Sequence, residues 1–370
     1  MLNALKLALF FIGGTLDVTA HEILTNGNIK EVHQVTGGPY GGTKVDEEFV
    51  SLLNKFFGAN VVEIFRAKYP GEWLELMNEF EMKKRGRRAS EGETTRIRLS
   101  RTFTSLVSEQ GAHDLAERFA GSCAVDDLKF VRNEYFCLGS TAMKKLFDPV
   151  IKGIVEHLKN LLKSRALKRV EFFFLVGGFA ESVLLQDAIK KQFSSQFTIL
   201  VPNNASIAVV QGAVMFGQRP GIIASRKMST TYGIEVYRPF DASIHPIHKK
   251  VELEGVIYCK DCLGVLVKEG EVVQVEGRRH FTYTPITSRQ TSFEVAFYAP
   301  SNPNAKFTTD PKVGPSIGKV AVSSPDISKG KDREINVCLY FGGTEIEVTV
   351  IDVTSKNTGT ASLDFLYRRT

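Results

Sequence analysis

The stretch Val170-Glu-Phe-Phe-Phe-Leu-Val176 ends in Gly177-Gly178, and a segment with helical spacing of apolar residues follows from Val183 to Phe193. A continuous apolar run of this length predicts a buried strand of a parallel sheet. The order of strand, double glycine and helix places the glycines at the carboxyl edge of that sheet, where ligands bind in α/β proteins. The sequence therefore predicts an α/β domain with a candidate ligand site at this turn.

Residues 7–36 read as a β-hairpin, with a first strand from Leu7 to Ile23 that Gly13-Gly14 breaks and a second strand from Ile29 to Val35. Asn26-Gly27-Asn28 between them is a strong turn signal. The apolar start of the chain is similar to a secretory signal, but Lys6 interrupts it, no basic region precedes it, and it passes directly into Gly13-Gly14-Thr15-Leu16-Asp17. We therefore interpret the start as a buried strand.

Gly13-Gly14-Thr15-Leu16-Asp17 lies within the first of these strands. Glycines allow backbone N–H groups to approach phosphate oxygens, Thr15 adds a hydroxyl, and Asp17 can hold a hydrated cation. Taken alone, two glycines in a hairpin more often mark a turn or a bulge. Taken together with the second glycine pair, which also follows an apolar strand, they favour a shared ligand site.

Other segments show helical or strand periodicity. Helical spacing recurs at residues 45–57, about 70–88 and 141–162. Beyond about residue 220, short β-rich stretches alternate with turns rich in Gly, Pro, Asn and Ser, which predicts an antiparallel sandwich. The expected strands include residues 231–237, 271–275, 292–298, 334–340 and 345–351.

Composition narrows the class of protein. The chain has 370 residues and a formal charge of +6, with Lys and Arg spread along its length beside 41 acidic residues, so we expect no nucleic-acid partner. No stretch has about 18 uninterrupted apolar residues, so we expect no membrane span. The five cysteines are odd in number and mostly far apart, which is typical of reduced thiols and indicates a cytoplasmic location.

Neither the cysteines nor the histidines predict a metal site. Cys259-Lys-Asp-Cys262 has CxxC spacing, but no second CxxC or paired histidine follows it. The histidines show no metal-ligand spacing beyond His245 and His248, which flank a proline in a predicted loop. We assign no metal and give the histidines no role.

Several motifs together resemble the superfamily of actin, sugar kinases and 70-kDa heat-shock proteins. Gly13-Gly14-Thr15 resembles its second phosphate motif and Gly177-Gly178 its adenosine motif. Phe80-Glu-Met-Lys-Lys-Arg85 is similar to the adenosine-gripping helix of the heat-shock branch. The resemblance to a divergent group of that branch, the heat shock 70 kDa protein 12A/12B group, covers nearly the whole chain and includes Gly37 to Asp46, Ala213 to Gly217, Phe307 to Pro311 and the tail from Glu334 to Phe365.

The resemblance implies a fold, a ligand and a partner. Residues 1–220 would form the second lobe of an actin-like ATPase, of ribonuclease H-like α/β type, with a helical subdomain inserted at about 45–135. Residues 221–370 would form an antiparallel β-sandwich-like substrate domain that binds a client peptide or protein. The ligand would be ATP or ADP with magnesium. The implied nucleotide contacts are Gly13, Gly14, Thr15, Asp17, Gly38, Glu81, Lys84, Arg85, Gly177, Gly178 and Glu181.

The chain departs from the family pattern at the catalytic positions. The family opens its second phosphate motif with an aspartate and three glycines, whereas Phe10, Phe11 and Ile12 stand at the first three positions here. Phenylalanine does not orient water or metal near a γ-phosphate, so we expect hydrolysis to be slower by orders of magnitude and assign no catalytic residue. The resemblance begins at the second lobe, which predicts an open, weakly binding half-cleft.

Three functions are compatible with this pattern. The first is an ATP-binding, chaperone-like stress protein with impaired or absent hydrolysis. The sequence does not decide whether this protein is an ATPase. The alternative is a nucleotide-independent module that binds proteins through its β-rich domain. A sugar or metabolite kinase is the weakest, because its catalytic base would belong to the first lobe and it would have no β-sandwich tail.

Overall fold

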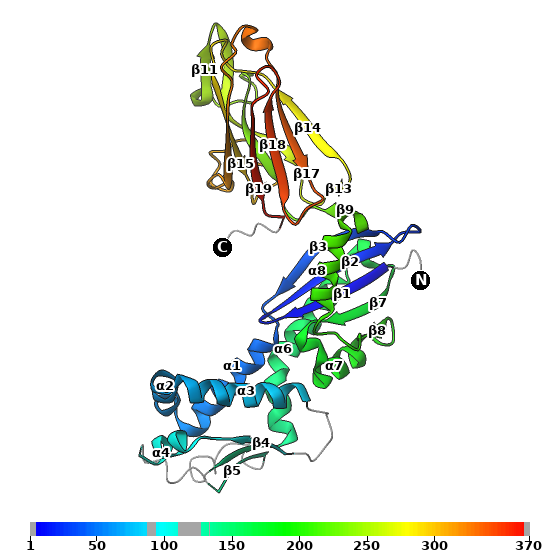
Figure 1. The fold of residues 1–370 in the computed structure, drawn as a ribbon, viewed down its shortest axis with the longest axis vertical. Coiled ribbons are helices and arrows are strands. Elements are labelled where there is room, and N and C mark those ends of the chain that lie inside the picture. The colour runs from blue at the N-terminus through cyan, green and yellow to red at the C-terminus, as the bar shows by residue number, and fades with distance from the viewer. Residues whose placement is uncertain (1–4, 87–93, 110–126, 133, 366–370) are drawn as a thin grey trace. The chain divides into compact units, whose positions relative to one another are not determined.

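The computed structural model describes residues 5–86, 94–109, 127–132 and 134–365. Within these ranges the chain divides into two compact units, drawn in Figure 1. The first, called the α/β unit, comprises residues 5–20 and 35–214. The second, called the β-rich unit, comprises residues 21–34 and 215–365.

Parallel strands form the centre of the α/β unit. β7 (Val170–Val176) lies between β1 (Leu5–Ile12) and β8 (Thr198–Leu200), and both of these neighbours run parallel to it. β2 (Thr15–Ile23) lies on the other side of β1. The predicted strand at 170–176 is therefore confirmed with the same bounds. Its alternate residues Phe173 and Leu175 are fully buried.

The predicted break of residues 7–23 at Gly13-Gly14 is confirmed, and it separates two strands where one interrupted strand was expected. Two strands, β1 and β2, occupy this stretch, and the chain reverses between them at the Gly13-Gly14 turn. Gly13 has a φ of +57°, a conformation that other residues rarely adopt, so the glycine pair forms a turn of its own. β3 (Ile29–Gly38) follows the predicted turn, in which the Asn28 N–H donates to Asn26 Oδ1 at 3.0 Å.

Helices and a small sheet complete the α/β unit. The helices are α1 (Gly42–Phe57), α2 (Ala59–Lys68), α3 (Pro70–Gly86), α4 (Arg101–Glu109), α6 (Ser140–Leu161), α7 (Val183–Phe193) and α8 (Ala208–Gln218), the last of which continues into the β-rich unit. Short 3-10 turns are η3 (Arg165–Leu167) and η4 (Gly178–Glu181). The antiparallel strands β4 (Thr95–Arg98), β6 (Tyr135–Leu138) and β5 (Leu128–Val131) form the small sheet, which lies with α1 to α4 at one end of the unit (Figure 1).

Aromatic packing fixes the helix that carries the predicted charged residues. α1 buries Val45, Phe49 and Leu53, which share one helical face. The Phe49 ring stacks on Phe80 of α3, with ring centroids 3.9 Å apart and planes 6° from parallel. Both rings are fully buried. This contact holds the last turns of α3 beside the start of α1.

The β-rich unit contains two larger antiparallel sheets. The first has the order β11 (Lys250–Leu253), β12 (Val256–Val267), β10 (Tyr232–Pro239), β15 (Ser292–Tyr298) and β16 (Gly318–Ser323). The second has the order β14 (Arg278–Tyr283), β17 (Ile335–Tyr340), β18 (Ile346–Asp352) and β19 (Thr358–Leu363). Residues of both sheets, among them Phe297 and Val348, share one buried core.

Shorter elements complete the β-rich unit. β9 (Ile223–Lys227) pairs parallel with β3 at Ile29 and antiparallel with β13 (Val272–Gln274). The 3-10 turns of the unit are η5 (Pro220–Ile222), η6 (Ile247–Lys249) and η7 (Gly330–Asp332). The described residues thus form a mixed α/β fold with additional antiparallel sheets.

Candidate functional site

A pocket of about 230 Å³ in the α/β unit brings together the predicted glycine and charged motifs. It lies where the β1–β2 turn, the start of α1, the end of α3 and the turn after β7 meet. The lining residues are Gly13, Gly42, Thr43, Asp46, Glu81, Lys84, Arg85, Gly178, Phe179 and Ser182.

The turn after β7 requires glycine at Gly177. This residue has a φ of +95°, and a Cβ built on it would lie 2.2 Å from the carbonyl oxygen of Phe11. Its N–H donates to the carbonyl of Ala205 at 2.7 Å. Gly177 thus lets β7 lie closely against the end of β1 and directs Gly178 toward the pocket, without lining the pocket itself.

The start of α1 packs directly on the β1–β2 turn. The Gly41 N–H donates to the carbonyl of Gly14 at 3.0 Å, and a Cβ on Gly41 would lie 2.3 Å from the carbonyl oxygen of Gly13. No side chain of the described residues caps this helix end, and its first turn carries no acidic residue. The first backbone N–H groups of a helix have no partner within the helix and carry a partial positive charge. Gly42 and Thr43, at this end of α1, line the pocket.

Lys84 is the centre of a charge cluster on the pocket wall. Its side chain is only 5% exposed, and its Nζ lies 2.8 Å from Asp46 Oδ1 and in closer contact with Glu81. It also donates to the carbonyl of Gly42 at 3.2 Å. Arg85 is more exposed and donates from Nε to Glu81 Oε1 at 2.6 Å. Lys84 therefore ties the end of α3 to the first turns of α1.

The two carboxylates of this cluster titrate differently. Burial raises the pKa of Asp46, and the hydrogen bond and charge of Lys84 offset that rise only in part. For Glu81, burial also acts to raise the pKa, but hydrogen bonds from Lys84 and Arg85 together outweigh it and lower the pKa. Glu81 is thus held as a carboxylate, with both of its basic neighbours on the pocket wall.

Ser182 places an unpartnered hydroxyl at the pocket. The residue is 3% exposed and precedes α7, at the position where serine usually caps a helix. Its Oγ makes no such capping hydrogen bond and has no other hydrogen-bond partner among the described residues. A buried hydroxyl without a partner is costly. Its place on the pocket wall is therefore the strongest local indication of a ligand.

The structure gathers some of the predicted residues and leaves others outside the pocket. Gly13, Glu81, Lys84, Arg85 and Gly178 line it. Among those outside, Glu181 accepts a hydrogen bond from the Ser206 N–H at 3.2 Å, and Asp17 accepts one from the Thr15 hydroxyl at 3.4 Å. The other predicted residues outside the lining are Gly14, Thr15, Gly38 and Gly177.

Sequence reasoning missed the other lining residues as contacts. Asp46 and Thr43 belong to the quoted glycine loop, and Ser182 follows the second glycine pair, so each lay beside a recognised motif. Their role depends on burial and on the direction of their side chains, which residue order does not specify.

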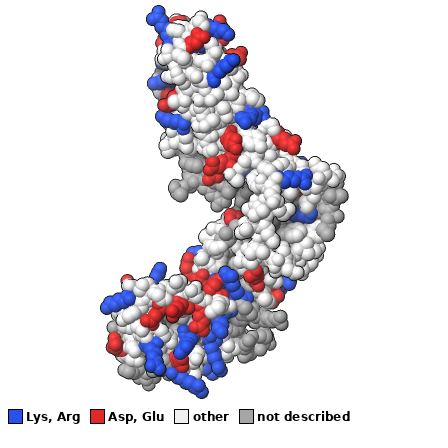
Figure 2. Space-filling model, in the orientation of Figure 1, with Lys and Arg blue, Asp and Glu red and all other residues white. Residues whose placement is uncertain are grey.

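A larger pocket of about 490 Å³ in the α/β unit has a different character. It lies beside α3, β4 and the start of α4, with carboxylates and guanidinium groups in its wall. Arg98 Nε lies 2.9 Å from Glu134, and the Thr102 hydroxyl donates to Glu72 at 3.0 Å. Figure 2 shows acidic and basic side chains interleaved over this end of the unit. Because Arg98, Glu134 and Glu72 already have partners within the protein, we do not assign a site here.

No family model matches the sequence. Comparison with curated proteins does find relatives along 96% of the chain, and these relatives carry the name of the 70-kDa heat-shock family. The chain is therefore related to that family. In particular, it is 33% identical over 357 residues to heat shock 70 kDa protein 12A of Homo sapiens and of Mus musculus, and 31% identical over 364 residues to heat shock 70 kDa protein 12B of Homo sapiens.

These matches confirm the resemblance to the 12A/12B group. The chain spans about half the length, 53%, of the curated relatives that it matches. Among the residues that the structure describes, no helix is long and apolar enough to cross a membrane. The predicted cytoplasmic location remains a prediction.

Proposed function

We propose that the pocket of the α/β unit binds an adenine nucleotide and that the protein acts as a nucleotide-binding, chaperone-like relative of the 70-kDa heat-shock proteins. The observation that carries this proposal is the convergence of Gly178, the Lys84 cluster, the unpartnered Ser182 hydroxyl and the start of α1 on one pocket. Separate stretches of sequence supply these groups, and each offers chemistry that a nucleotide uses.

We assign the groups to the nucleotide as follows. The α1 terminus at Gly42 and the turn at Gly13 would face the phosphates, because free N–H groups and a helix dipole favour anions. Gly178 would lie flat against the base or ribose. The hydroxyl of Ser182 and the outer guanidinium nitrogens of Arg85 would donate hydrogen bonds to the adenosine. Glu81 would accept from a ribose hydroxyl, since its pKa is held low.

The affinity of the pocket for an adenine nucleotide should be modest. A pocket of about 230 Å³ is smaller than the ~300–1,000 Å³ typical of small-molecule sites, so it would enclose only part of the nucleotide. Contacts on the open side compete with water. We expect a Kd of about 100 μM, which corresponds to about 5.5 kcal/mol of binding free energy.

We further propose that binding occurs without hydrolysis. Asp46 and Glu81, the carboxylates of the pocket lining, are both ion-paired to Lys84 and are therefore engaged. Phe10, half-buried on β1, stands where the family has the aspartate of its motif. Its neighbour Phe11 is fully buried and meets Phe179 edge to face, with ring centroids 6.0 Å apart. Magnesium would then be carried by the nucleotide phosphates, and ATP affinity should depend little on the metal.

The proposal also assigns each part of the chain to a domain of the family. We assign residues 1–220 to the second lobe of an actin-like nucleotide-binding domain, with residues about 45–135 as its inserted helical subdomain. Residues 221–370 would be the substrate-binding-like domain. The parallel strands β1, β7 and β8 and the two antiparallel sheets of the β-rich unit support this assignment.

The test is calorimetric titration of the full chain with ATP and with ADP, with and without magnesium. Gly178→Val is the blocking variant, because a Cβ at Gly178 meets nothing closer than the Arg85 guanidinium at 3.8 Å and should point into the pocket without strain. Gly71→Val on α3 is the matched control, since its Cβ would meet nothing within 4 Å. Ser182→Ala tests the unpartnered hydroxyl.

We expect ATP and ADP to bind wild type and Gly71→Val equally, Gly178→Val to lose binding, and Ser182→Ala to bind about 3- to 10-fold more weakly, the loss of roughly one hydrogen bond. Circular dichroism would show whether each variant is folded. A folded wild-type chain that gives no heat at millimolar nucleotide would contradict the proposal.

The alternative, a protein-interaction module independent of nucleotide, also has a specific observation in its favour. The β-rich unit contains a pocket of about 590 Å³ with an aromatic and apolar wall that includes Tyr237, Tyr258, Tyr283, Ile286 and Tyr298. A client peptide would suit such a surface. Peptide binding that is unchanged in the folded Gly178→Val variant and insensitive to ATP would favour this function.

A further inference from the structure

The CxxC sequence of the β-rich unit lies at a bulge in β12. Residues three apart in a regular strand point to opposite faces of the sheet, so Cys259 and Cys262 would normally be separated. Here Cys262 lies opposite Val236 and Cys259 opposite Arg238, with a register shift between them. Asp261, between the cysteines, has a left-handed φ of +58°. The extra residue of a bulge re-aims the side chains on the bulged strand, which brings the two sulfurs to one side.

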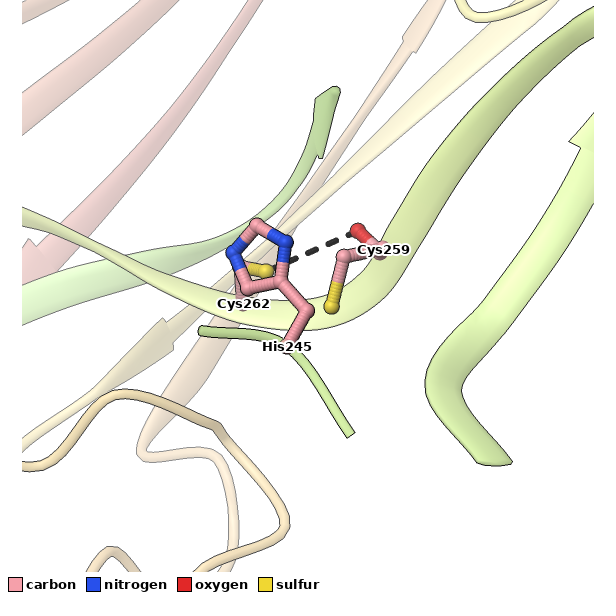
Figure 3. Close-up of side chains that lie close together, drawn as sticks. All are labelled: His245, Cys259 and Cys262. Carbon is pink, nitrogen blue, oxygen red and sulfur yellow. Dashed lines mark hydrogen bonds between the residues drawn. The ribbon is translucent and has the colours of Figure 1, made fainter. Parts of the chain in front are cut away.

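His245 completes the cluster from a different segment. It lies in the loop between β10 and η6, and Figure 3 shows its ring beside both cysteine side chains. The candidate ligand atoms of His245, Cys259 and Cys262 all lie within 4.8 Å of one another. Both cysteines are buried, and His245 is half-buried. Thirteen residues of sequence lie between His245 and Cys259, so the spacing by itself did not indicate this arrangement.

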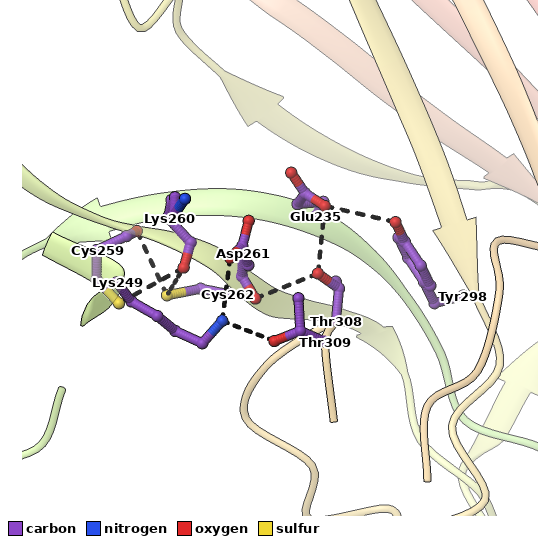
Figure 4. Close-up of polar contacts among 9 residues, drawn as sticks. All are labelled: Glu235, Lys249, Cys259, Lys260, Asp261, Cys262, Tyr298, Thr308 and Thr309. Atoms are coloured by element: carbon purple, nitrogen blue, oxygen red, sulfur yellow. Dashed lines mark hydrogen bonds and ion pairs between the residues drawn. The ribbon is translucent and has the colours of Figure 1, made fainter. Parts of the chain in front are cut away.

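Surrounding contacts hold the bulge in place. Lys249 is 6% exposed, and its Nζ lies 3.0 Å from Asp261 Oδ2 and 2.6 Å from the Thr309 hydroxyl. The Thr308 N–H donates to the carbonyl of Asp261 at 2.8 Å. Figure 4 shows this network around the two cysteines. Asp261 neutralises the charge of Lys249. The bulge that brings the two cysteines together is thus held by Lys249 from one segment and by Thr308 from another.

We propose that Cys259, Cys262 and His245 form a binding site for a thiophilic divalent cation of the zinc type. Two thiolates and one imidazole are ligands that zinc prefers, and a fourth position would be left for water. Tetrahedral zinc with Zn–S bonds of about 2.3 Å places its ligand atoms roughly 3.8 Å apart, so the present cluster needs to contract by at most about 1 Å. Side-chain rotations would supply this contraction.

Binding has identifiable costs. The Asp241 N–H donates to His245 Nδ1 at 3.0 Å, and coordination through either ring nitrogen would end that hydrogen bond. The Cys262 Sγ also contacts the carbonyl of Cys259 at 3.5 Å. Both thiols would lose their protons, so zinc binding should release protons and weaken at low pH. A bound ion would tie the 240–249 loop to β12.

The same two thiols could instead form a Cys259–Cys262 disulfide, which would need no histidine. The metal is favoured because His245 supplies a third ligand of the right type at the same point. Burial of both cysteines also limits their access to thiol–disulfide exchange.

The experiment uses the full chain purified anaerobically with reductant. Metal content is measured by elemental mass spectrometry, and Zn²⁺ and Co²⁺ are titrated into the metal-free protein. Cys262→Ser and His245→Asn are the test variants. Cys338→Ser is the matched control, because Cys338 is a buried thiol of the same unit that lies 3.1 Å from a single histidine nitrogen, His280 Nδ1.

We expect one equivalent of zinc, a sulfur-to-cobalt charge-transfer band, and a higher melting temperature with zinc in wild type and Cys338→Ser. Cys262→Ser should lose the band, and His245→Asn should weaken zinc binding by about 10- to 100-fold, at least the effect of losing a supporting residue of a metal site. Because His245 is half-buried, His245→Asn tests the site even if Cys262→Ser unfolds.

Two results would overturn the proposal. One is zinc binding by His245→Asn and Cys262→Ser that equals wild type. The other is the absence of zinc binding at micromolar concentrations, including the case in which peptide mapping finds a Cys259–Cys262 disulfide in the anaerobically purified chain.

Discussion

Replacing Lys84 by methionine tests the charge cluster that joins α3 to α1. The substitution keeps most of the apolar stem but removes the ammonium group from Asp46, Glu81 and the carbonyl of Gly42. Removing one partner of a fully buried ion pair costs about 3–5 kcal/mol. The side chains of Asp46 and Glu81 are 26% and 33% exposed, so water replaces part of the lost interaction. We therefore expect the free energy of unfolding of the α/β unit to fall by about 2–3 kcal/mol at pH 7.

The loss should shrink as the pH falls. Without Lys84, the pKa of Asp46 in the folded state rises further above its unfolded value. The buried carboxylate therefore destabilises the folded variant at pH values where Asp46 is ionised, and protonation removes this effect as the pH falls. In wild type the lowered pKa of Glu81 gives stability that is present above its unfolded pKa and is lost in acid. Both effects make the difference between wild type and Lys84→Met largest near pH 7 and smaller near pH 4.

The assay is urea unfolding followed by the fluorescence of Trp73. This residue is the only tryptophan of the chain and lies on α3, so it reports on the α/β unit. Lys83→Met is the matched control: Lys83 is the exposed neighbour of Lys84 on the same helix, and its loss should change stability by no more than ~0.5 kcal/mol. Equal stabilities of the two variants at pH 7, or a Lys84→Met deficit that is the same at pH 4, would refute the reasoning.

Two further predictions concern Gly177 and Glu31. Gly177→Ala should destabilise the α/β unit by at least about 2 kcal/mol, because the φ of +95° and the Phe11 carbonyl oxygen 2.2 Å from the new Cβ both oppose a side chain. Gly178→Ala, the control, should change the free energy of unfolding by no more than ~0.5 kcal/mol. Similar urea midpoints for the two variants would contradict this prediction. Glu31 lies in the β-rich unit, where burial raises its pKa to about 7 against a hydrogen bond from the Lys227 N–H and the charges of Arg226 and Lys227. A raised folded pKa contributes stability below the unfolded pKa and loses it as the pH rises through 7, so Glu31→Gln should become more stable relative to wild type by about 2–3 kcal/mol between pH 4.5 and 8. Hydrogen exchange of the β9 amides at several pH values measures this difference in stability. A difference that does not vary with pH would show that the pKa of Glu31 is not raised in the folded protein.

Local patterns in the sequence determined the elements with strong periodicity. The apolar run at 170–176 became β7, and the apolar spacing at 141–162 became α6, with bounds one residue earlier at each end. The expected strands at 334–340 and 345–351 became β17 and β18, which pair antiparallel. These features depend on neighbours a few residues apart, which is the range that periodicity and turn chemistry describe. The break at Gly13-Gly14 shows the limit of that range, since the same glycines fit a bulge within one strand or a reversal of the chain between two strands.

The tertiary structure alone decided which side chains share a site. Lys84 belongs to a charged run that a sequence would place in solvent, yet the Phe49–Phe80 stack presses this part of α3 on α1 and buries it. Ser182 stands where a helix cap is expected, and only the fold leaves its hydroxyl unpartnered beside the pocket. His245 has no spacing that points to the CxxC sequence, and a one-residue bulge in β12 brings both sulfurs to it. Burial and side-chain direction are set by contacts between distant segments. The sequence therefore indicated the motifs and part of the pocket lining, whereas only the tertiary structure showed Ser182 and His245 as members of candidate sites.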